Sequence, residues 1–197
     1  MTVDTSLESY LQDLYRRGRE HDAPLADRLL RLRNMTPAAA GLIALLIRAQ
    51  GSRNVLEVGT SNGYSAIWFA DAVRDTGGRL VTVEVDGERA ERARANIAAA
   101  GVAEQVSVVH GDGGEVLAAA ADASVDLVVL DAERPAYVDY WPHLRRVLVP
   151  WGVIAVDNAV SHSGQLVEFH ELLAADGEFA VRLIELGDGV LTAVRRR

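Results

Sequence analysis

One glycine-rich loop carries residue types that could hold a nucleotide-like ligand. It reads EVGTSNGYS over residues 57–65 and lies between a predicted strand and a predicted helix. Gly59 and Gly63 allow a sharp turn and a close approach of the backbone to a ligand, and N–H groups at the start of the next helix can hold an anion. The dinucleotide fingerprint is G-x-G-x-x-G. The G-x-x-x-G spacing found here, with Glu57 two residues before the first glycine, favours S-adenosylmethionine over NAD.

Two further candidate sites follow predicted strands. Glu84 ends the second strand, where a carboxylate can accept hydrogen bonds from both hydroxyls of a ribose. The sequence HGDG, residues 110–113, follows the third strand, and Asp112 could accept a hydrogen bond from the exocyclic amine of an adenine. An ordinary Gly-Asp-Gly turn is the alternative. Asp86 is better explained as a helix N-cap.

Three oxygen-bearing side chains end two other strands. Asp131 closes the fourth strand, and Asp157 and Asn158 close the fifth. Because parallel strands end at the same edge of a sheet, these side chains should converge. Hard cations such as Mg²⁺ prefer oxygen ligands, and a cation would relieve repulsion between the carboxylates. Strand-end acids that cap the next segment are the alternative.

Alternating strands and helices must position these residues. Strands are predicted at residues 54–58, 79–85, 106–109, 125–130, 152–156, 179–185 and 190–194, and helices at 7–17, 24–33, 37–50, 63–73, 87–100, 137–148 and 164–175. The pattern predicts an α/β fold, a Rossmann-like, doubly wound, seven-stranded, mostly parallel sheet with extra N-terminal helices. A closing hairpin through Gly187-Asp188-Gly189 makes the C-terminal strand antiparallel.

Composition sets the broad limits. A chain of 197 residues fits one domain over 1–197, with a helical cap at 1–50 and a core at 51–197. The net charge of −8 disfavours nucleic acid, and the absence of cysteine excludes thiol nucleophiles and zinc-thiolate sites. The N-terminus lacks a signal-peptide pattern, and the longest apolar stretch, residues 38–47, is too short to span a bilayer. We expect a cytoplasmic protein without a membrane partner.

The motifs, taken in order, resemble the metal-dependent class I O-methyltransferases of the catechol and caffeoyl-CoA type, including small bacterial members. They are VLEVGTSNGYSA, LVTVEVD, GDG, VDLVVLDAERPAYVDY, GVIAVDN and LGDGVLTAVRR, from about Met35 to the C-terminus. The resemblance implies an S-adenosyl-L-methionine-dependent O-methyltransferase that uses Mg²⁺ or another divalent cation. It also implies a small, catechol-like hydroxylated aromatic as the acceptor and a homodimeric assembly.

The same resemblance implies three groups of site residues. The cofactor-binding residues are Met35, Glu57, Gly59, Thr60, Ser61, Gly63, Tyr64, Ser65, Glu84, Val85, Gly111, Asp112, Gly113 and Asp131. The metal ligands are Asp131, Asp157 and Asn158, and the catalytic residues are Asp131, Arg134 and His162.

The chain departs from this family at the predicted metal loop. The family commonly has Asp-x-x-Lys, with the lysine acting as a base near the reacting hydroxyl, whereas residues 131–134 here read DAER. Arginine stays protonated in proteins, so Arg134 could stabilise a phenolate or simply pair with Glu133 or Asp131. His162 has a suitable intrinsic pKa for a proton acceptor, and a loop histidine without a catalytic role is the alternative.

Three other functions remain open from the sequence. The first is a metal-independent methyltransferase with Asp131 or His162 as the base. The second is a nicotinamide-dependent oxidoreductase, which the loop spacing disfavours. The third is a non-catalytic module that binds S-adenosylmethionine or S-adenosylhomocysteine, a possibility that Arg134 raises.

Overall fold

A computed structural model describes residues 5–196 of the chain as alternating helices and strands. Residues 1–4 and 197, which belong to the predicted single domain, lie outside the described residues. The helices are α1 (Thr5–Asp22), α2 (Pro37–Gln50), α3 (Tyr64–Thr76), α4 (Gly87–Ala99), α5 (Gly113–Ala119), α6 (Tyr137–Val147) and α7 (Val167–Ala175). The strands are β1 (Asn54–Val58), β2 (Arg79–Glu84), β3 (Val106–His110), β4 (Val125–Leu130), β5 (Leu148–Val156), β6 (Phe179–Ile184) and β7 (Val190–Arg195). Short 3₁₀ turns occupy Arg28–Leu30, Ala103–Gln105, Arg134–Ala136 and Ser163–Gln165.

All seven strands form one sheet in the order β3-β2-β1-β4-β5-β7-β6. The pairs among β1 to β5 are parallel, and β7 runs antiparallel to both of its neighbours. This confirms the predicted doubly wound sheet with an antiparallel C-terminal strand. The strand order reverses between β1 and β4, and ligands of such sheets bind at the carboxyl ends of the strands near this reversal.

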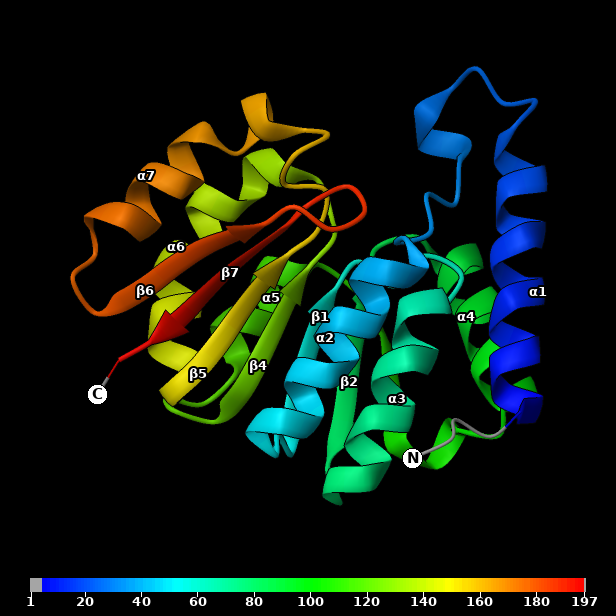
Figure 1. Cartoon of the computed structure of the whole chain (residues 1–197), viewed down its shortest axis with the longest axis horizontal. Helices are drawn as coiled ribbons and strands as arrows, with labels where there is room; N and C mark the ends of the chain where they lie inside the picture. Colours follow the sequence, from blue (N-terminus) through cyan, green and yellow to red (C-terminus); the bar gives the residue numbers. More distant parts are fainter. Residues whose placement is uncertain (1–4, 197) are drawn as a thin grey trace.

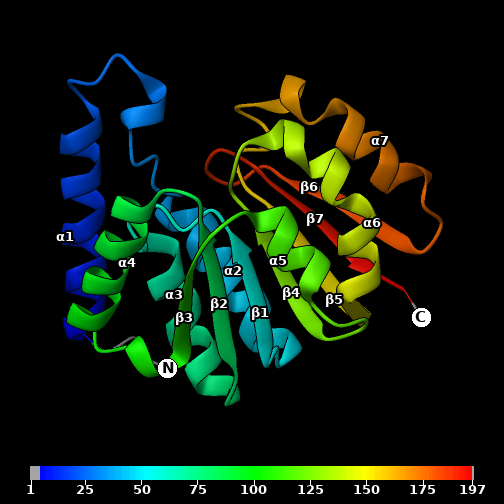
Figure 2. The same cartoon turned by 180° about the vertical axis from the view of Figure 1, so that it is seen from behind.

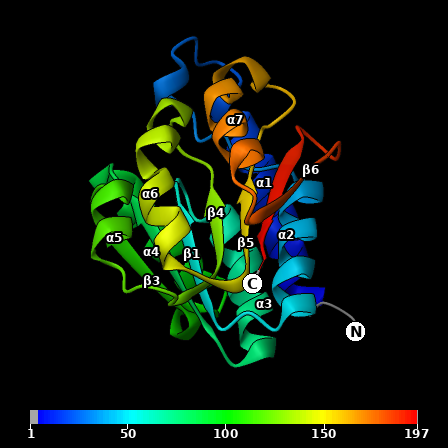
Figure 3. The ribbon, with the colours of Figure 1, turned by 90° about the vertical axis from the view of Figure 1, so that its left-hand side faces the viewer.

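Helices cover both faces of the sheet. Residues of α1, α2, α3 and α4 pack against one face, and residues of α5, α6 and α7 pack against the other. Figure 1 shows α2 and α3 in front of the sheet, Figure 2 shows α5 and α6 in front of the opposite face, and Figure 3 shows the sheet between the two layers. The parallel strands are therefore buried on both faces, which explains apolar runs such as VDLVVL in β4.

Two predicted helix starts are confirmed by their caps. The Thr36 hydroxyl accepts a hydrogen bond from the backbone N–H of Ala39 at 3.2 Å, and Pro37 occupies the first helical position of α2. The carboxylate of Asp86 accepts from the N–H of Arg89 at 2.9 Å at the start of α4. The Asp86 carboxylate is therefore engaged as a helix cap, as predicted.

The predicted helix at residues 24–33 is wrong. Only Arg28–Leu30 form a single 3₁₀ turn, flanked by Asp27 and Arg31 in extended conformations, and Arg33 has a positive φ of 53°. The Asp22 carboxylate accepts from the N–H groups of Leu32 and Arg33 at 2.7 and 2.9 Å, and the Arg31 guanidinium donates to the Leu25 carbonyl at 2.8 Å. Side chains thus satisfy backbone groups that a helix would have paired.

Smaller differences concern element ends. Helix α1 is longer than the predicted 7–17, α7 begins only at Val167, and β5 begins already at Leu148. The short helix α5 was missed, since it is seven residues long and opens with two glycines. Among the described residues, no helix is long and apolar enough to cross a membrane.

Candidate functional site

A cavity of about 500 Å³ lies at the carboxyl ends of the central strands. It runs from the loops after β1, β2 and β3 to the loops after β4 and β5, across the strand-order reversal. Predicted residues on the side of β1, β2 and β3 are Gly59, Ser61, Glu84, Val85, Gly111, Asp112 and Gly113, and those on the side of β4 and β5 are Asp131, Arg134, Asn158 and His162. The other predicted residues, Met35, Glu57, Thr60, Gly63, Tyr64, Ser65 and Asp157, do not line it.

Gly59 brings the glycine-rich loop against the backbone of the β4 end. It adopts a φ of +105°, and a Cβ there would lie 2.3 Å from the carbonyl oxygen of Asp131. Its N–H donates to the Val83 carbonyl at 2.9 Å, and the N–H of Asp131 donates to the Val58 carbonyl at 2.9 Å. A larger residue would force the loops after β1 and β4 apart, so glycine is required here.

Glu84 links the ends of β1 and β2. Its carboxylate accepts from the N–H of Ser61 at 2.7 Å and from the N–H of Asp86 at 3.1 Å. The side chain is 7% exposed yet lines the cavity. Ser61 itself has a positive φ of 49°. The carboxylate is held in place by two backbone donors and faces the cavity, where it can accept hydrogen bonds from ligand hydroxyls.

Glu57 lies underneath the loop, in the core. It is fully buried, accepts from the hydroxyls of Ser65 at 2.5 Å and Thr82 at 2.6 Å, and Thr82 contacts the hydroxyl of Thr60 at 2.6 Å. Burial raises the pKa of Glu57 to about 7, although these hydrogen bonds lower it. Glu57 therefore stabilises the glycine-rich loop from the core side through these hydrogen bonds. Its direct contact with a ligand stays a prediction.

The GDG motif forms the start of α5. The Asp112 carboxylate accepts from the N–H of Glu115 at 3.0 Å as an N-cap and also lines the cavity. A Cβ at Gly113 would lie 2.4 Å from Cγ1 of Val58, and one at Gly114 would lie 2.8 Å from the ring of Tyr140. Both glycines let α5 pack closely against β1 and α6, so the motif has a packing role, and its contact with a ligand stays a prediction.

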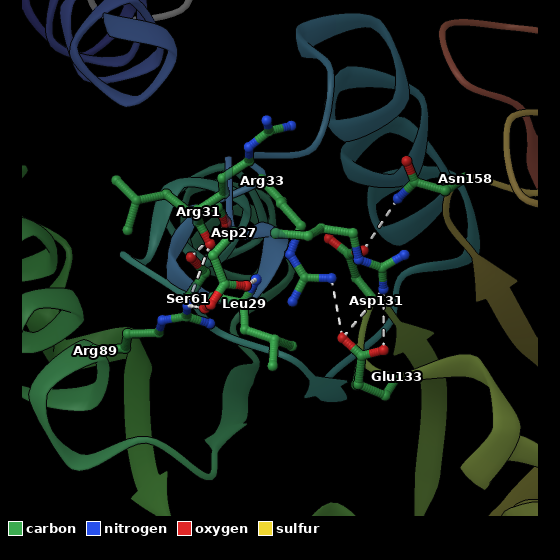
Figure 4. Close-up of polar contacts among 12 residues, drawn as sticks. Asp27, Leu29, Arg31, Arg33, Ser61, Arg89, Asp131, Glu133 and Asn158 are labelled. Atoms are coloured by element: carbon green, nitrogen blue, oxygen red, sulfur yellow. Dashed lines mark hydrogen bonds and ion pairs between the residues drawn. The ribbon is translucent and has the colours of Figure 1, made fainter. Parts of the chain in front are cut away.

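Asp131, Asp157 and Asn158 converge as predicted. The amide nitrogen of Asn158 donates to Asp131 at 3.2 Å and to Asp157 at 2.8 Å (Figure 4 shows the first contact). Burial and the neighbouring Asp157 carboxylate raise the pKa of Asp131 well above its ordinary value. Burial raises the pKa of Asp157 to about 6. Two neighbouring carboxyl groups ionise with difficulty unless a cation lies between them.

The chemistry of this donor set fits a hard divalent cation. One oxygen of Asp157, Oδ1, is buried without a hydrogen-bond partner among the described residues. Asn158 has a φ of 61°, a conformation that asparagine tolerates and that often occurs at functional sites. The set comprises two carboxylates and an amide, and no group of three or more His, Cys, Asp or Glu side chains gathers anywhere in residues 5–196.

The loop after β4 carries Arg134 into the cavity. The hydroxyl of the fully buried Tyr137 accepts from the N–H of Ala132 at 2.8 Å and donates to its carbonyl at 3.0 Å, which fixes the loop. Arg134 is only 4% exposed, and its Nε has no partner in the described chain. Partial burial, followed by the charge of Arg134, lowers the pKa of His162. The ion pair of Arg134 with Glu133 or Asp131, which the sequence left open as an alternative, is not formed, and Glu133 pairs with Arg28 and Arg33 instead.

Residues 23–36, which we call the strap, run from α1 to α2 (Figure 1). Leu29, Leu32, Arg33 and Asn34 of the strap line the cavity. Glu133 pairs with both Arg28 and Arg33 of the strap at 3.0 Å each (Figure 4). The Ser61 hydroxyl donates to the Leu32 carbonyl at 2.7 Å, and Arg89 donates to strap carbonyls, including that of residue 31 at 3.2 Å. The strap thereby joins the glycine-rich loop, α4 and the loop after β4.

Several lining residues were missed by the sequence interpretation. They are Leu29, Leu32, Arg33 and Asn34 of the strap, Arg89 of α4, Tyr140 of α6 and Asp188 of the β6–β7 turn. Tyr140 and Asp188 lie within two motifs that carry the family resemblance, VDLVVLDAERPAYVDY and LGDGVLTAVRR, but were given no site role. The strap residues and Arg89 belong to no such motif, and most of the strap was assigned to a helix.

The fold and this cavity define a Rossmann-like protein that binds a ligand at the point where the strand order reverses. A family model described as O-methyltransferase matches residues 6–197. A protein named as an O-methyltransferase from Mycobacterium tuberculosis is 36% identical over 174 residues, which are 82% of this chain and 77% of the relative.

Solved structures agree with this assignment. The O-methyltransferase TomG from Streptomyces achromogenes, involved in tomaymycin synthesis and solved in complex with S-adenosylmethionine, is 29% identical with a TM-score of 0.76, covering 100% of this chain and 92% of TomG. An O-methyltransferase from Bacillus cereus in complex with S-adenosylhomocysteine is 26% identical with a TM-score of 0.75, covering 100% and 93%. The chain belongs to the O-methyltransferase family, which confirms the family and enzyme class expected from the motifs.

The buried carboxyl group of Glu57 predicts a pH-dependent stability. Its pKa rises from 4.5 to about 7 on folding, so between these values the unfolded chain is ionised while the folded chain keeps the proton. Stability should therefore fall as the pH rises through this window and level off above it. Glu57→Gln should reduce this pH-dependent loss of stability by about 2 to 3 kcal/mol. The measurement is the free energy of unfolding in urea at pH 4.5 to 8 with EDTA present.

Glu171→Gln provides the control, because Glu171 is exposed on α7. In this variant the free energy of unfolding should depend on pH as it does in the natural chain. The same pH dependence in Glu57→Gln would contradict the argument from the burial of Glu57.

The two ion pairs of Glu133 predict that the strap opens more readily without them. Glu133→Gln should increase cleavage by trypsin after Arg28, Arg31 and Arg33 by about two- to fivefold, since exposed ion pairs contribute modestly. Mass spectrometry of timed digests identifies the cleaved bonds. Glu168→Gln, an exposed change on α7, should be digested at the rate of the natural chain. Equal rates of cleavage in the natural chain and both variants would contradict the role of Glu133 in holding the strap closed.

Proposed function

We propose that this chain is an Mg²⁺-dependent, S-adenosylmethionine-dependent O-methyltransferase that methylates a hydroxyl of a small, catechol-like aromatic. One observation carries the proposal. A single cavity of about 500 Å³ joins a glycine-rich loop and a strand-end carboxylate to the Asp131–Asn158 oxygen cluster. S-adenosylmethionine is consumed in the reaction and is therefore a substrate, and the similar protein TomG was solved in complex with it.

The cofactor end of the cavity offers the groups that this methyl donor needs. Glu84 would accept hydrogen bonds from the ribose hydroxyls, and Asp112 would accept one from the adenine amine. Val85 and Leu29 expose 72% and 63% of their surface beside them and offer apolar contact to a flat base. Gly59 and Ser61 would lie against the methionine part. Glu57, Thr60, Gly63, Tyr64, Ser65 and Met35 would support this loop from the core.

The acceptor end would hold the cation and the hydroxylated ring. Asp131, Asp157 and Asn158 are the proposed ligands, because their oxygens fit a hard cation and two of them are carboxyls of raised pKa. A bound divalent cation would lower the pKa of an acceptor hydroxyl. Arg134 and His162 line the same end. The strap and α6 would exclude water from the reacting atoms and align acceptor and donor.

Ligand binding tests the methyl-donor part of the proposal. S-adenosylhomocysteine at 100 times its Kd should raise Tm by about 5 to 10 °C, because it binds only the folded chain. Glu84→Gln should weaken this binding about tenfold or more, since hydrogen bonds to a charged group are lost. The measurement is a thermal-shift titration.

Glu88→Gln is the matched control, because Glu88 is an exposed carboxylate on α4 outside the cavity. It should bind like the natural chain. No thermal shift at millimolar S-adenosylhomocysteine would contradict the methyl-donor assignment, and strong binding of NADH instead would favour an oxidoreductase.

Removal of divalent cations tests the metal. EDTA should abolish methyl transfer to vicinal diphenols, and excess Mg²⁺ should restore it, whereas S-adenosylhomocysteine should still bind. Asp157→Asn should raise the Mg²⁺ concentration needed for half-maximal transfer about tenfold or more, as a carboxylate ligand is lost. Transfer that persists in EDTA would leave a methyltransferase without metal dependence.

The homodimer and the cytoplasmic location stay predictions. Analytical ultracentrifugation of the natural chain would test the first, and fractionation of the source cells would test the second. The absence of a nucleic-acid partner also stays a prediction, supported by the net charge of −8.

A further inference from the structure

Arg134 is a buried cation that acts on Asp131 and Asp157 only over distances longer than an ion pair. It is 4% exposed, lines the cavity and forms no ion pair with any described residue. The nearest acid in the sequence, Glu133, is already held by Arg28 and Arg33. The Nε of Arg134 also lacks a hydrogen-bond partner in residues 5–196. The protein therefore presents a desolvated guanidinium to whatever occupies the acceptor end.

A buried guanidinium without an ion-pair partner destabilises the folded state unless a ligand provides the partner. Burying a charge without a partner destabilises the folded state, and arginine cannot escape the cost by losing its proton. An anionic oxygen in the cavity would supply the missing counter-charge. Charge-assisted hydrogen bonds to a guanidinium are also stronger than neutral ones.

The other charged groups at this end have partners of their own or line the cavity. Arg33 and Glu133 pair with one another, and the carboxyl groups of Asp131 and Asp157 both accept from the Asn158 amide. His162 and Asp188 line the cavity. The chain contains no lysine, as all 20 of its Lys and Arg residues are arginine. No lysine can therefore replace Arg134, and His162 is the histidine among the described lining residues to be tested against it.

We propose, on the basis of the proposed function, that Arg134 receives the acceptor oxygen as an anion, so that the enzyme selects phenols acidic enough to bind as phenolates. Catechols with an electron-withdrawing ring substituent belong to this class. In the transfer step a phenolate lone pair forms the new O–C bond while the methyl C–S bond breaks and its electron pair returns to sulfur. No proton moves in this step, and a neutral ether and a neutral thioether result.

The ionisation of a bound acceptor tests this directly. The probe is 4-nitrocatechol, whose ionised form absorbs visible light, titrated with pH in the S-adenosylhomocysteine complex with EDTA present. Its pKa should be lower when bound than when free by about one to three pH units, the usual effect of an adjacent opposite charge. Arg134→Gln should abolish this decrease, and Arg134→Lys should keep part of it.

Two controls accompany these variants. Arg182→Gln, an exposed change on β6, and His162→Asn should both keep the decrease. An unchanged pKa in the natural chain, or a decrease that survives in Arg134→Gln or disappears in His162→Asn, overturns the proposal. Stabilisation by S-adenosylhomocysteine reports whether each variant is folded. If that stabilisation holds but 4-nitrocatechol does not bind, the acceptor proposal fails while the methyl-donor assignment stands.

Methyl transfer with Mg²⁺ provides a second readout. Across substituted catechols, the midpoint of the pH profile of kcat/KM should move with the pKa of each acceptor, because the ionised acceptor is the species bound. A midpoint that stays fixed across the series would show that a protein group removes the proton, and would overturn the proposal.

Discussion

The close approach of two strand ends at Gly59 is the constraint on which the site depends. With no side chain at residue 59, the loop after β1 rests on the backbone of Asp131, which ends β4. The hydrogen bonds from Gly59 to Val83 and from Asp131 to Val58 hold three strand ends together. The proposed cofactor loop and the proposed metal loop thereby share one rigid junction, so a donor carbon and an acceptor oxygen can be aligned without large movements.

The same close approach of strand ends brings buried charged groups together. Burial and the charges of Asp157 and Glu57 raise the pKa of Asp131, and Arg134 is the one buried cation among residues 5–196. A cationic ligand, such as a sulfonium or a divalent metal, would offset the charge of these carboxylates, and the Arg134 guanidinium would then remain available to an anionic acceptor.

The sequence predicts the parts of this structure that depend on local rules. Apolar runs predict the strands, and Thr36 and Asp86 predict helix starts, because caps act over three residues. The strand-end positions of Glu84, Asp131 and Asn158 follow from the parallel topology. The conformation of the strap could not be predicted, because it depends on partners outside the strap. The Asp22 carboxylate takes the place of helical hydrogen bonds, and Glu133, which pairs with Arg33, lies about a hundred residues away in the chain. The unpaired state of Arg134 likewise appears only once Glu133 is seen to be occupied.

The β6–β7 turn has a consequence for how such enzymes diversify. Backbone hydrogen bonds join Ala159 to Gly189 at 2.9 Å and Val160 to Asp188 at 2.9 Å, so this turn supports the loop after Asn158 and brings Asp188 to the cavity wall. The donor end is built from residues before 114, whereas the far wall, apart from the strap, comes from residues after 130. Insertions or exchanges in the C-terminal hairpin can therefore remodel the acceptor wall during evolution while the donor half is inherited unchanged.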